Sequence, residues 1–421
     1  MPKPFLKIAH VSDTHAGYRA GREVDAFGVN LRENDGYKSF EEMVTQIIEN
    51  DVDCVLMAGD TFHISVPTAR SILFVRAQLW RLWEASIPVY ALGGNHEIKD
   101  VAADISSSAI LHDPWRGLYS HVEPYVKHEI KDGVFLHLIS HHMYGEQFET
   151  MKQVKPVKGA INIFSTHGSV IDPILEMKLH TEQSPREIVI PDGMLYDNDW
   201  SYTLLGHIHE RGWVGSKDGM TDTYNSKIYY NGSLLRRGFS DAEVPLGRGW
   251  TLWEVDEKGV FKAKPKEVWQ RPQLDFKTIN ATEMTASDIS DRIISNLRGT
   301  QEDGNKFIVE SAPILRQPLL NIDSAKYAAL DWKHISENRG HAFDWKPHKI
   351  SKEQVIGKND NDNFGIIETL SSGDIVEAFE RWTKTSEMLE KITEEKTKEK
   401  VSKQAKSYIK SGQEKEIERE D

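Results

Sequence analysis

Five short apolar runs in the first half of the chain each end in a cluster of glycine, aspartate, asparagine or histidine. The runs are Leu6–Val11, Cys54–Ala58, Val89–Leu92, 161–165 and Tyr202–Leu205. Continuous short apolar runs are typical of strands that are buried on both faces of a sheet. Amphipathic segments at 36–50, 68–85 and 101–112 predict helices between them. This alternation predicts an α/β fold, in which sites form at the carboxyl ends of strands.

The clusters after the runs have the side chains of one kind of metal site. They are Asp13-x-His15, Gly59-Asp60, Gly94-Asn95-His96, His167-Gly168 and Gly206-His207-x-His209. Carboxylate, imidazole and amide oxygen suit Mn²⁺, Fe²⁺ or Zn²⁺. We expect the two ligands of each x-spaced pair to point the same way, because side chains alternate along an extended segment. Two such ions would activate a water and clamp the oxygens of a displacement at phosphorus.

The composition excludes several classes of protein. With 421 residues, of which 39% are hydrophobic and 28% charged, the chain fits a soluble globular protein of about two to four domains. Its single cysteine, Cys54, excludes an internal disulfide framework. No apolar run approaches the ~18 residues of a membrane span, and the start does not read as a signal peptide. The net charge of −13 argues against coating nucleic acid through bulk positive charge.

The chain divides into five predicted segments. Residues 1–272 hold the motifs, and Arg271-Pro272 marks the boundary to a small mixed α/β segment at 273–350. A polar linker is predicted at 351–373. Residues 374–410 hold an apolar stripe at helical spacing, which predicts a helical segment that docks on a partner. A disordered tail is predicted at 411–421.

The ordered motifs resemble those of the calcineurin-like metallophosphoesterase superfamily. Within it they are similar to the SbcD-type nuclease subunits and their archaeal, eukaryotic and phage relatives in DNA double-strand-break processing. The run Gly59-Asp60-Thr61-Phe62-His63, the segment 231–239 and Arg271-Pro272 also resemble that branch. The resemblance covers residues 5–270. It implies a layered α-β-β-α metallophosphoesterase core, followed by a small mixed α/β capping domain and a C-terminal helical tail.

The resemblance also implies roles for individual residues. One metal ion would be held by Asp13, His15, Asp60 and His209, and a second by Asp60, Asn95, His167 and His207. His96 would stabilise the charged transition state and protonate the leaving oxygen, and His63 would orient His96 or the substrate. Glu97 stands where the family most often has aspartate, a change expected to alter hydrogen bonding around the site and to leave the ligands intact.

Several basic residues and histidines outside the motifs have two readings each. Arg236, Arg237 and Arg248 would supply the local basic patch for DNA phosphates, or would pair with structural acids. The arginine-containing segment 17–37 would contact phosphates or form a solvated loop. His141-His142 would reach the site from the end of an apolar run, or would serve local packing, which we expect. We expect His10 to be a satisfied structural histidine.

By resemblance, the function is that of a Mn²⁺-dependent DNA exonuclease and single-strand endonuclease. The resemblance also implies a homodimer, with the helices at 68–85 and 101–112 at the interface. It further implies a coiled-coil ABC-type ATPase as partner in break repair or recombination. Such a protein would be cytoplasmic, in a prokaryotic cell or a phage-infected host. Two alternatives are a stand-alone metallophosphoesterase for small phosphodiesters or phosphoproteins, and a non-catalytic structural subunit. The long extension after Arg271 argues against the first, and the intact ligand set against the second.

Overall fold

The computed structural model divides the chain into two compact units, Met1–Lys349 and Ile350–Asp421. It describes residues 4–350 apart from gaps at 22, 99–105, 122, 142–145, 171–188, 191–194, 196–198, 215–226, 238–246, 300–312 and 339–343. The linker, helical segment and tail predicted at 351–421 therefore lie outside the described residues.

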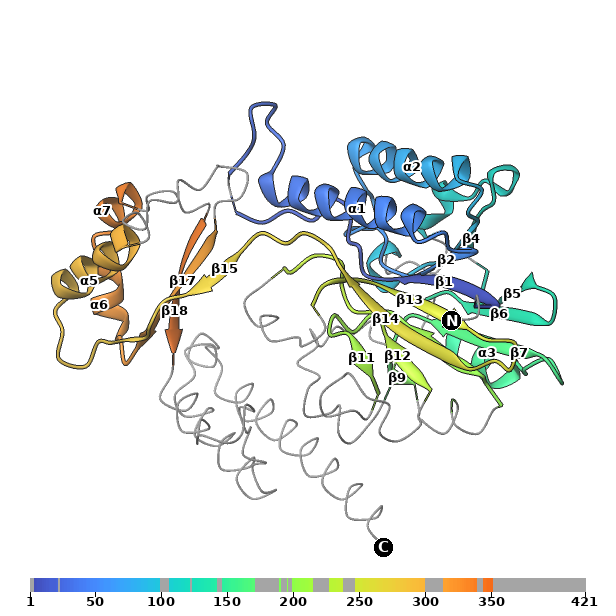
Figure 1. The fold of residues 1–421 in the computed structure, drawn as a ribbon. Coiled ribbons are helices and arrows are strands. Elements are labelled where there is room, and N and C mark those ends of the chain that lie inside the picture. Colours follow the sequence, from blue (N-terminus) through green and yellow to red (C-terminus); the bar gives the residue numbers. More distant parts are fainter. Residues whose placement is uncertain are drawn as a thin grey trace, which may run out of the picture. The chain divides into compact units, whose positions relative to one another are not determined.

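The first six-stranded sheet has the order β14-β13-β1-β2-β3-β4 (Figure 1). Its strands are β1 (Leu6–Val11), β2 (Cys54–Ala58), β3 (Val89–Leu92), β4 (Leu118–His121), β13 (Gly249–Val255) and β14 (Phe261–Glu267). β1 to β4 run parallel to one another, and β13 and β14 add antiparallel to one edge. The carboxyl ends of the first three strands therefore meet at one edge of this sheet.

The second six-stranded sheet has the order β11-β12-β10-β7-β6-β5. Its strands are β5 (Val126–Lys131), β6 (Val134–Ile139), β7 (Ile161–Thr166), β10 (Tyr202–Leu205), β11 (Gly212–Trp213) and β12 (Ile228–Tyr230). The central strands β6, β7, β10 and β12 are parallel, and the two edge strands are antiparallel. A separate two-stranded pair joins β8 (Ser169–Val170) and β9 (Val189–Ile190).

Three layers of apolar side chains hold the sheets and helices together. Along β1, Ala9 and Val11 pack into the core beneath the helices, whereas Leu6 and Ile8 pack into the core between the sheets. A third core lies on the other face of the second sheet, where Met151 packs from α3 (Glu146–Gln153). Because the central strands face apolar cores on both sides, their sequences are continuous apolar runs. The architecture is the layered α-β-β-α arrangement that the resemblance implied.

Two helices cover the first sheet (Figure 1): α1 (Leu31–Glu49) and α2 (Ala69–Glu84). The predicted helix at 36–50 starts earlier, because the Asn30 side chain accepts hydrogen bonds from the first-turn backbone and caps the helix at Leu31. Thr68 caps α2 in the same way through the Ser71 N–H. The predicted α-helix at 101–112 is wrong over its described part, where Ser107–Leu111 form the 3₁₀ helix η2.

A smaller mixed segment follows β14 in the chain. It has the strands β15 (Gln273–Asp275), β16 (Ile279–Asn280), β17 (Ile314–Leu320) and β18 (Asp344–Ile350), and the helices α5 (Ala286–Gly299), α6 (Ser324–Ala328) and α7 (Trp332–Glu337). It has its own apolar core, which includes Ile289, Leu297 and Leu315. Short 3₁₀ helices η1 (Asn95–Glu97) and η3 (Pro114–Arg116) complete the described elements. Among the described helices, none combines the length and apolarity needed to cross a membrane.

Candidate metal centre

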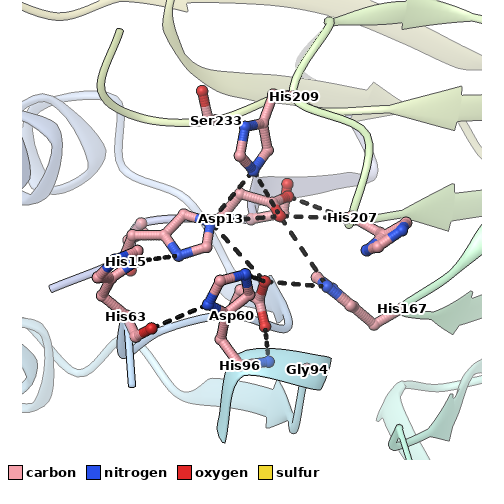
Figure 2. A network of polar contacts seen from close by, with 12 residues as sticks. Asp13, His15, Asp60, His63, Gly94, His96, His167, His207, His209 and Ser233 are labelled. Carbon is pink, nitrogen blue, oxygen red and sulfur yellow. Dashed lines mark hydrogen bonds and ion pairs between the residues drawn. The ribbon is translucent and has the colours of Figure 1, made fainter. Parts of the chain in front are cut away.

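The ends of five strands, three from the first sheet and two from the second, bring the motif residues together (Figure 2). Backbone hydrogen bonds join the first two motifs, from Asp13 N to the Gly59 carbonyl at 3.0 Å and from His15 N to the Asp60 carbonyl at 3.0 Å. In the second sheet, His167 forms a parallel bridge with Gly206. Segments far apart in sequence therefore share one rim, as expected for the carboxyl ends of strands.

The backbone at the motif residues is left-handed. Asp13, His15, Asp60 and His207 have φ angles of 50°, 45°, 52° and 96°. Such values are uncommon for residues other than glycine, and they cluster at functional sites. The expectation of extended segments at Asp13-x-His15 and His207-x-His209 is wrong, because Asp13, His15 and His207 have left-handed backbone.

The first group of candidate ligands is Asp13, His15 and His209, whose ligand atoms lie within 4.8 Å of one another. The Nε2 atoms of His15 and His209 are 3.1 Å apart, and Asp13 Oδ1 lies 3.9 Å and 3.6 Å from them. Asp60 Oδ2 lies 3.7 Å from His15 Nε2. These oxygen and nitrogen atoms are suitable ligands for a borderline divalent ion.

The second group gathers around the Asn95 side-chain oxygen. Asn95 Oδ1 lies 3.0 Å from His167 Nε2 and 3.2 Å from His207 Nδ1. Asp60 Oδ2 lies 3.3 Å from His167 Nε2. The other ring nitrogen of His167 donates to the Ala58 carbonyl at 2.8 Å, because a carbonyl can only accept. That bond leaves Nε2 as the ligand atom, which is the usual orientation of a metal-binding histidine.

Asp60 touches both groups, and its two oxygens have different neighbours. Oδ2 faces His15 and His167, whereas Oδ1 accepts the His96 backbone N–H at 3.0 Å. The Asp60 carboxylate is therefore oriented by the third motif while it faces ligands from the first and fourth motifs. This geometry suits a carboxylate shared by two metal ions.

Electrostatics provide a test of whether cations fit here. Asp13 and Asp60 are both almost fully buried. Burial raises the pKa of Asp13, and the nearby Asp60 charge adds to the rise. Burial has the same tendency at Asp60, but His167 and His15 hold the pKa of that carboxyl well below its usual value. Although burial opposes it, Asp60 and Asp13 raise the pKa of His167 to about 9. The two buried carboxylates stabilise a positive charge on the neighbouring His167. A site of this kind is suited to binding divalent cations.

His96 and His63 lie beside the ligands as a stacked pair, with ring centroids 5.3 Å apart. His96 Nδ1 donates to the His63 carbonyl at 2.9 Å, and its Nε2 lies 3.9 Å from Asp60 Oδ2. The His63 ring approaches His15, with 3.4 Å between their Nδ1 atoms. The His96 ring is thus fixed with Nε2 toward the centre, and the His63 backbone does the fixing.

Two glycines are required by close packing around the ligands. A Cβ at Gly94 would lie 2.1 Å from Asp60 Oδ1, and one at Gly206 would lie 2.0 Å from the Ala58 carbonyl oxygen. Neither contact is possible without moving backbone or a ligand. The glycines next to the ligands therefore permit the close approach of the motifs.

Glu97 is fully buried and links the second and third motifs. Its carboxyl accepts the Phe62 N–H at 3.0 Å and the Gly94 N–H at 2.8 Å. Burial, together with the Asp60 charge, raises the pKa of Glu97 to about 8. Glu97 thus acts on the backbone that carries the ligands. Sequence reasoning gave it an altered hydrogen-bonding role without identifying these partners.

The three candidate arginines occupy different environments. Arg248 is 2% exposed and donates from one guanidinium nitrogen to the His209 carbonyl and to Ser233 Oγ. Arg237 is partly exposed, and its guanidinium contacts the His209 ring. The backbone carbonyl of Arg236 accepts hydrogen bonds from Arg32 and Gln273. The sequence could not separate these roles, because it shows only that the residues are near one another in the chain.

Sequence reasoning missed Tyr18 as a part of this site. Its ring packs edge-on against His63 at 5.1 Å, and its hydroxyl donates to the Arg237 carbonyl at 3.3 Å. Tyr18 lies in the segment 17–37, whose arginines were the candidate phosphate contacts. Its position shortly after the first motif is the one signal that points to it. His141 is buried at the end of β6, with its backbone N–H on the Gly93 carbonyl, and His142 lies outside the described residues.

Two stacked sheets flanked by helices, with carboxylate and imidazole ligands at one rim, define an α/β metallohydrolase. Residues 6–231 match the family model of the calcineurin-like phosphoesterases, and the chain belongs to this family. Enzymes of this family use a binuclear centre of divalent metal ions, which the Asp13, Asp60 and His167 cluster fits.

One curated relative aligns with most of the chain, and others align with shorter parts of it. The DNA double-strand break repair protein Mre11 of Methanococcus maripaludis is 24% identical over 391 residues, which are 91% of this chain and 92% of that protein. The protein of the same name from Archaeoglobus fulgidus is 34% identical over 106 residues, 25% of this chain and 22% of that protein. Among solved structures, a dimetal phosphatase from Danio rerio matches with a TM-score of 0.36 and 14% identity, covering 61% of this chain and 94% of that one.

Proposed function

We propose that this chain is a Mn²⁺-dependent DNA nuclease that hydrolyses phosphodiester bonds at a binuclear metal centre. One observation carries the proposal: the motif residues converge on one rim in a chain that aligns almost end to end with an archaeal DNA double-strand break repair protein. The ligand set is complete, which favours a catalytic role over a purely structural one.

The proposed ligands follow the two groups in the structure. Asp13, His15, Asp60 and His209 hold one ion, and Asp60, Asn95, His167 and His207 hold the other. When bound, the ions lower the pKa of water and neutralise charge on the phosphate. The Ala58 carbonyl orients His167, and the His96 backbone N–H orients Asp60.

His96 is the proposed acid for the leaving group. Its Nδ1–H is held by the His63 carbonyl, so the imidazolium form presents Nε2–H toward the centre. In the hydrolysis the attacking water would lose one proton to solvent and form a bond from its oxygen to phosphorus, the bond to the leaving oxygen would break, and Nε2 would deliver a proton to that oxygen. Before this transfer, the same positive charge stabilises the transition state. His63 is the proposed positioning residue for His96.

We further propose exonuclease and single-strand endonuclease action together with a coiled-coil ABC-type ATPase, within a homodimer. We also propose that it works in the cytoplasm of a prokaryotic cell or of a phage-infected host. The proposed ATPase-docking segment, 374–410, lies outside the described residues. Its apolar stripe predicts that Ile375→Asp with Phe379→Asp abolishes co-purification with the ATPase and leaves Mn²⁺ binding intact. Loss of Mn²⁺ binding as well would argue for a different role of this segment.

The decisive experiment is cleavage of end-labelled linear duplex and single-stranded DNA by the purified chain, with Mn²⁺, Mg²⁺ or EDTA. Mn²⁺-dependent cleavage that His96→Ala lacks would establish the nuclease and its acid together. Rapid hydrolysis of a small chromogenic diester without cleavage of DNA, in the presence and absence of the ATPase, would instead favour a stand-alone phosphoesterase. A metal-dead variant that supports full function of the ATPase complex would favour a structural subunit.

A further inference from the structure

Arg237 is held at the metal centre by the chain segment before it. The Ser233 N–H donates to the His209 carbonyl at 3.0 Å, and the Leu234 N–H donates to the Asp13 carbonyl at 3.2 Å. Leu234 and Leu235 are both buried, so their side chains anchor the segment in the protein interior. Arg237 therefore leaves a fixed backbone that is tied to the first and last motifs.

The guanidinium of Arg237 lies directly against a candidate ligand. Its Nη2 is 2.8 Å from His209 Nδ1 and 3.0 Å from His209 Nε2. The Tyr18 ring also faces the guanidinium, with 5.7 Å between Cζ and the ring centroid. Among the residues that the structure describes, no carboxylate forms an ion pair with Arg237. This cation thus stands beside the centre without a carboxylate in direct ion-pair contact from the described part of the chain.

An arginine next to a cation-binding site is repelled by the bound cations. The arrangement becomes favourable when an anion contacts both the arginine and the cations. Arginine has only donors, and its planar fork matches two oxygens of a phosphate. If His209 Nε2 ligates a metal ion, its lone pair is no longer an acceptor for Arg237. The guanidinium then needs oxygen acceptors close to that ion, which is where the scissile phosphate of a phosphodiesterase must lie.

We propose that Arg237 is a catalytic residue that binds the scissile phosphate, donating hydrogen bonds to its non-bridging oxygens as negative charge develops there. The inference rests on the proposed function for the identity of the substrate, a nucleic-acid phosphodiester. It singles out one arginine of three. Arg248 is buried and donates hydrogen bonds to the His209 carbonyl and to Ser233 Oγ, so it holds the backbone of the last motif in place.

The test compares the wild type with Arg237→Ala, Arg237→Lys and the control Lys258→Ala, all in the full chain loaded with Mn²⁺. Lys258 lies in the β13–β14 turn, at the opposite end of the strands. Orthophosphate binding is measured by calorimetry, and kcat/KM is measured on DNA and on bis(p-nitrophenyl) phosphate. Arg237→Ala should weaken orthophosphate about 10-fold or more and lower kcat/KM on the order of 10²-fold, with unchanged Mn²⁺ stoichiometry. Guanidinium ion in the buffer should restore part of the rate.

The Lys variant keeps the charge but not the fork, so it should fall between Ala and wild type, and Lys258→Ala should match wild type. Arg237→Lys also provides the comparison with wild type if Arg237→Ala does not fold. Wild-type orthophosphate affinity in the folded Arg237→Ala protein would overturn the proposal, and so would loss of Mn²⁺, which would assign Arg237 to holding His209. A wild type that hydrolyses the small diester but not DNA would overturn the nuclease, while the Arg237 comparison would still be read on the diester.

Discussion

The backbone N–H of His96 donates to Oδ1 of Asp60 at 3.0 Å, while the other oxygen of this carboxylate faces ligands from two other motifs. The relationship separates two functions of one side chain. Oδ1 sets the direction of the carboxylate, and Oδ2, which faces the other candidate ligands, is the oxygen proposed to coordinate. An amide would keep the first function and lose the charge needed for the second.

Asp60→Asn should therefore fold normally and lose the metal centre. The asparagine oxygen can still accept the His96 N–H, but a neutral amide cannot balance two cations. We expect Mn²⁺ affinity to fall more than about 10²-fold, beyond the loss that is typical of outer ligand partners. Isothermal calorimetry checks this, with circular dichroism as the control for folding. Retention of two tightly bound ions would contradict the bridging role.

His96→Ala should give the opposite pattern. The side chain is proposed as an acid and not as a ligand, so both ions should remain bound. Loss of a general acid lowers kcat by about 10²–10⁴-fold. The loss should be smaller for a substrate whose leaving group is a nitrophenolate, because that group needs no proton. Equal losses on both substrates would remove His96 from the proton transfer.

Gly94→Ala tests the close approach of the second and third motifs. The new methyl group would lie 2.1 Å from Asp60 Oδ1 and 2.4 Å from Asp60 N, so the carboxylate must move. A displacement of about 1 Å at a reacting group can cost about 10²-fold in rate, and we expect at least that loss. Gly36→Ala is the matched control. Gly36 lies inside α1, and the new methyl group would be 3.7 Å from Leu235 Cδ2, an ordinary contact distance. The control should keep full activity and gain about 0.5–1 kcal/mol in the free energy of unfolding.

The strands were predictable because each apolar run is short and ends in a turn signal. Those at Leu6–Val11, Cys54–Ala58 and Val89–Leu92 have the predicted bounds. The start of α1 could not be predicted. Asn30 caps this helix, but its first turn is polar and therefore has the sequence pattern of a loop. The helix at 101–112 was wrong over 107–111, where the chain closes a 3₁₀ helix through the Ser106 side chain.

At the site, residue types and order predicted which side chains meet, but not how they are aimed. The left-handed backbone at Asp13 and His15 depends on the tertiary bonds to Gly59 and Asp60, which no local pattern encodes. The same limit applies to Glu97. Its carboxyl binds two N–H groups from different motifs, so its role exists only once those motifs have been brought together.

His10 predicts a pH dependence of stability. It is fully buried, as expected of a structural histidine. Neither ring nitrogen has a hydrogen bond of normal geometry among the described residues, although the Leu205 backbone interacts with the ring. Burial, with a contribution from the Arg211 charge, lowers the pKa of His10 to about 3 from 6.5. The unfolded chain therefore binds a proton that the folded chain refuses, so stability is lost as the pH falls from about 6.5 toward 3.

His10→Leu should remove this part of the acid sensitivity. Between pH 7.5 and 5.5 the wild type should lose about 1.4 kcal/mol more of its free energy of unfolding than the variant. Urea denaturation at both pH values measures the difference. At pH 7.5 the variant should be at least as stable as the wild type, because it leaves no buried donor unpaired. Parallel losses in the two proteins would show that His10 takes up a proton in the folded state.

The outer face of α2 predicts self-association. Leu73, Trp80 and Trp83 are 68%, 43% and 44% exposed, whereas Val75 and Leu79 on the other face are buried in the core. The Arg116 guanidinium lies 5.6 Å and 5.4 Å from the two indole rings, so the surface is ordered as well as apolar. Large exposed apolar side chains on one helix suit an interface, and the homodimer is the occupant that we propose.

Light scattering on the purified chain should then give twice the monomer mass of 48.0 kDa. Leu73→Glu with Trp80→Glu places two charges in the apolar face and should give the monomer mass, with Mn²⁺ binding unchanged because no ligand lies on α2. Val260→Glu is the matched control, a charge at a 58% exposed apolar residue in the β13–β14 turn, and it should remain dimeric. A dimer that survives both α2 substitutions would move the interface to another face, and a monomeric wild type would remove the homodimer from the proposal.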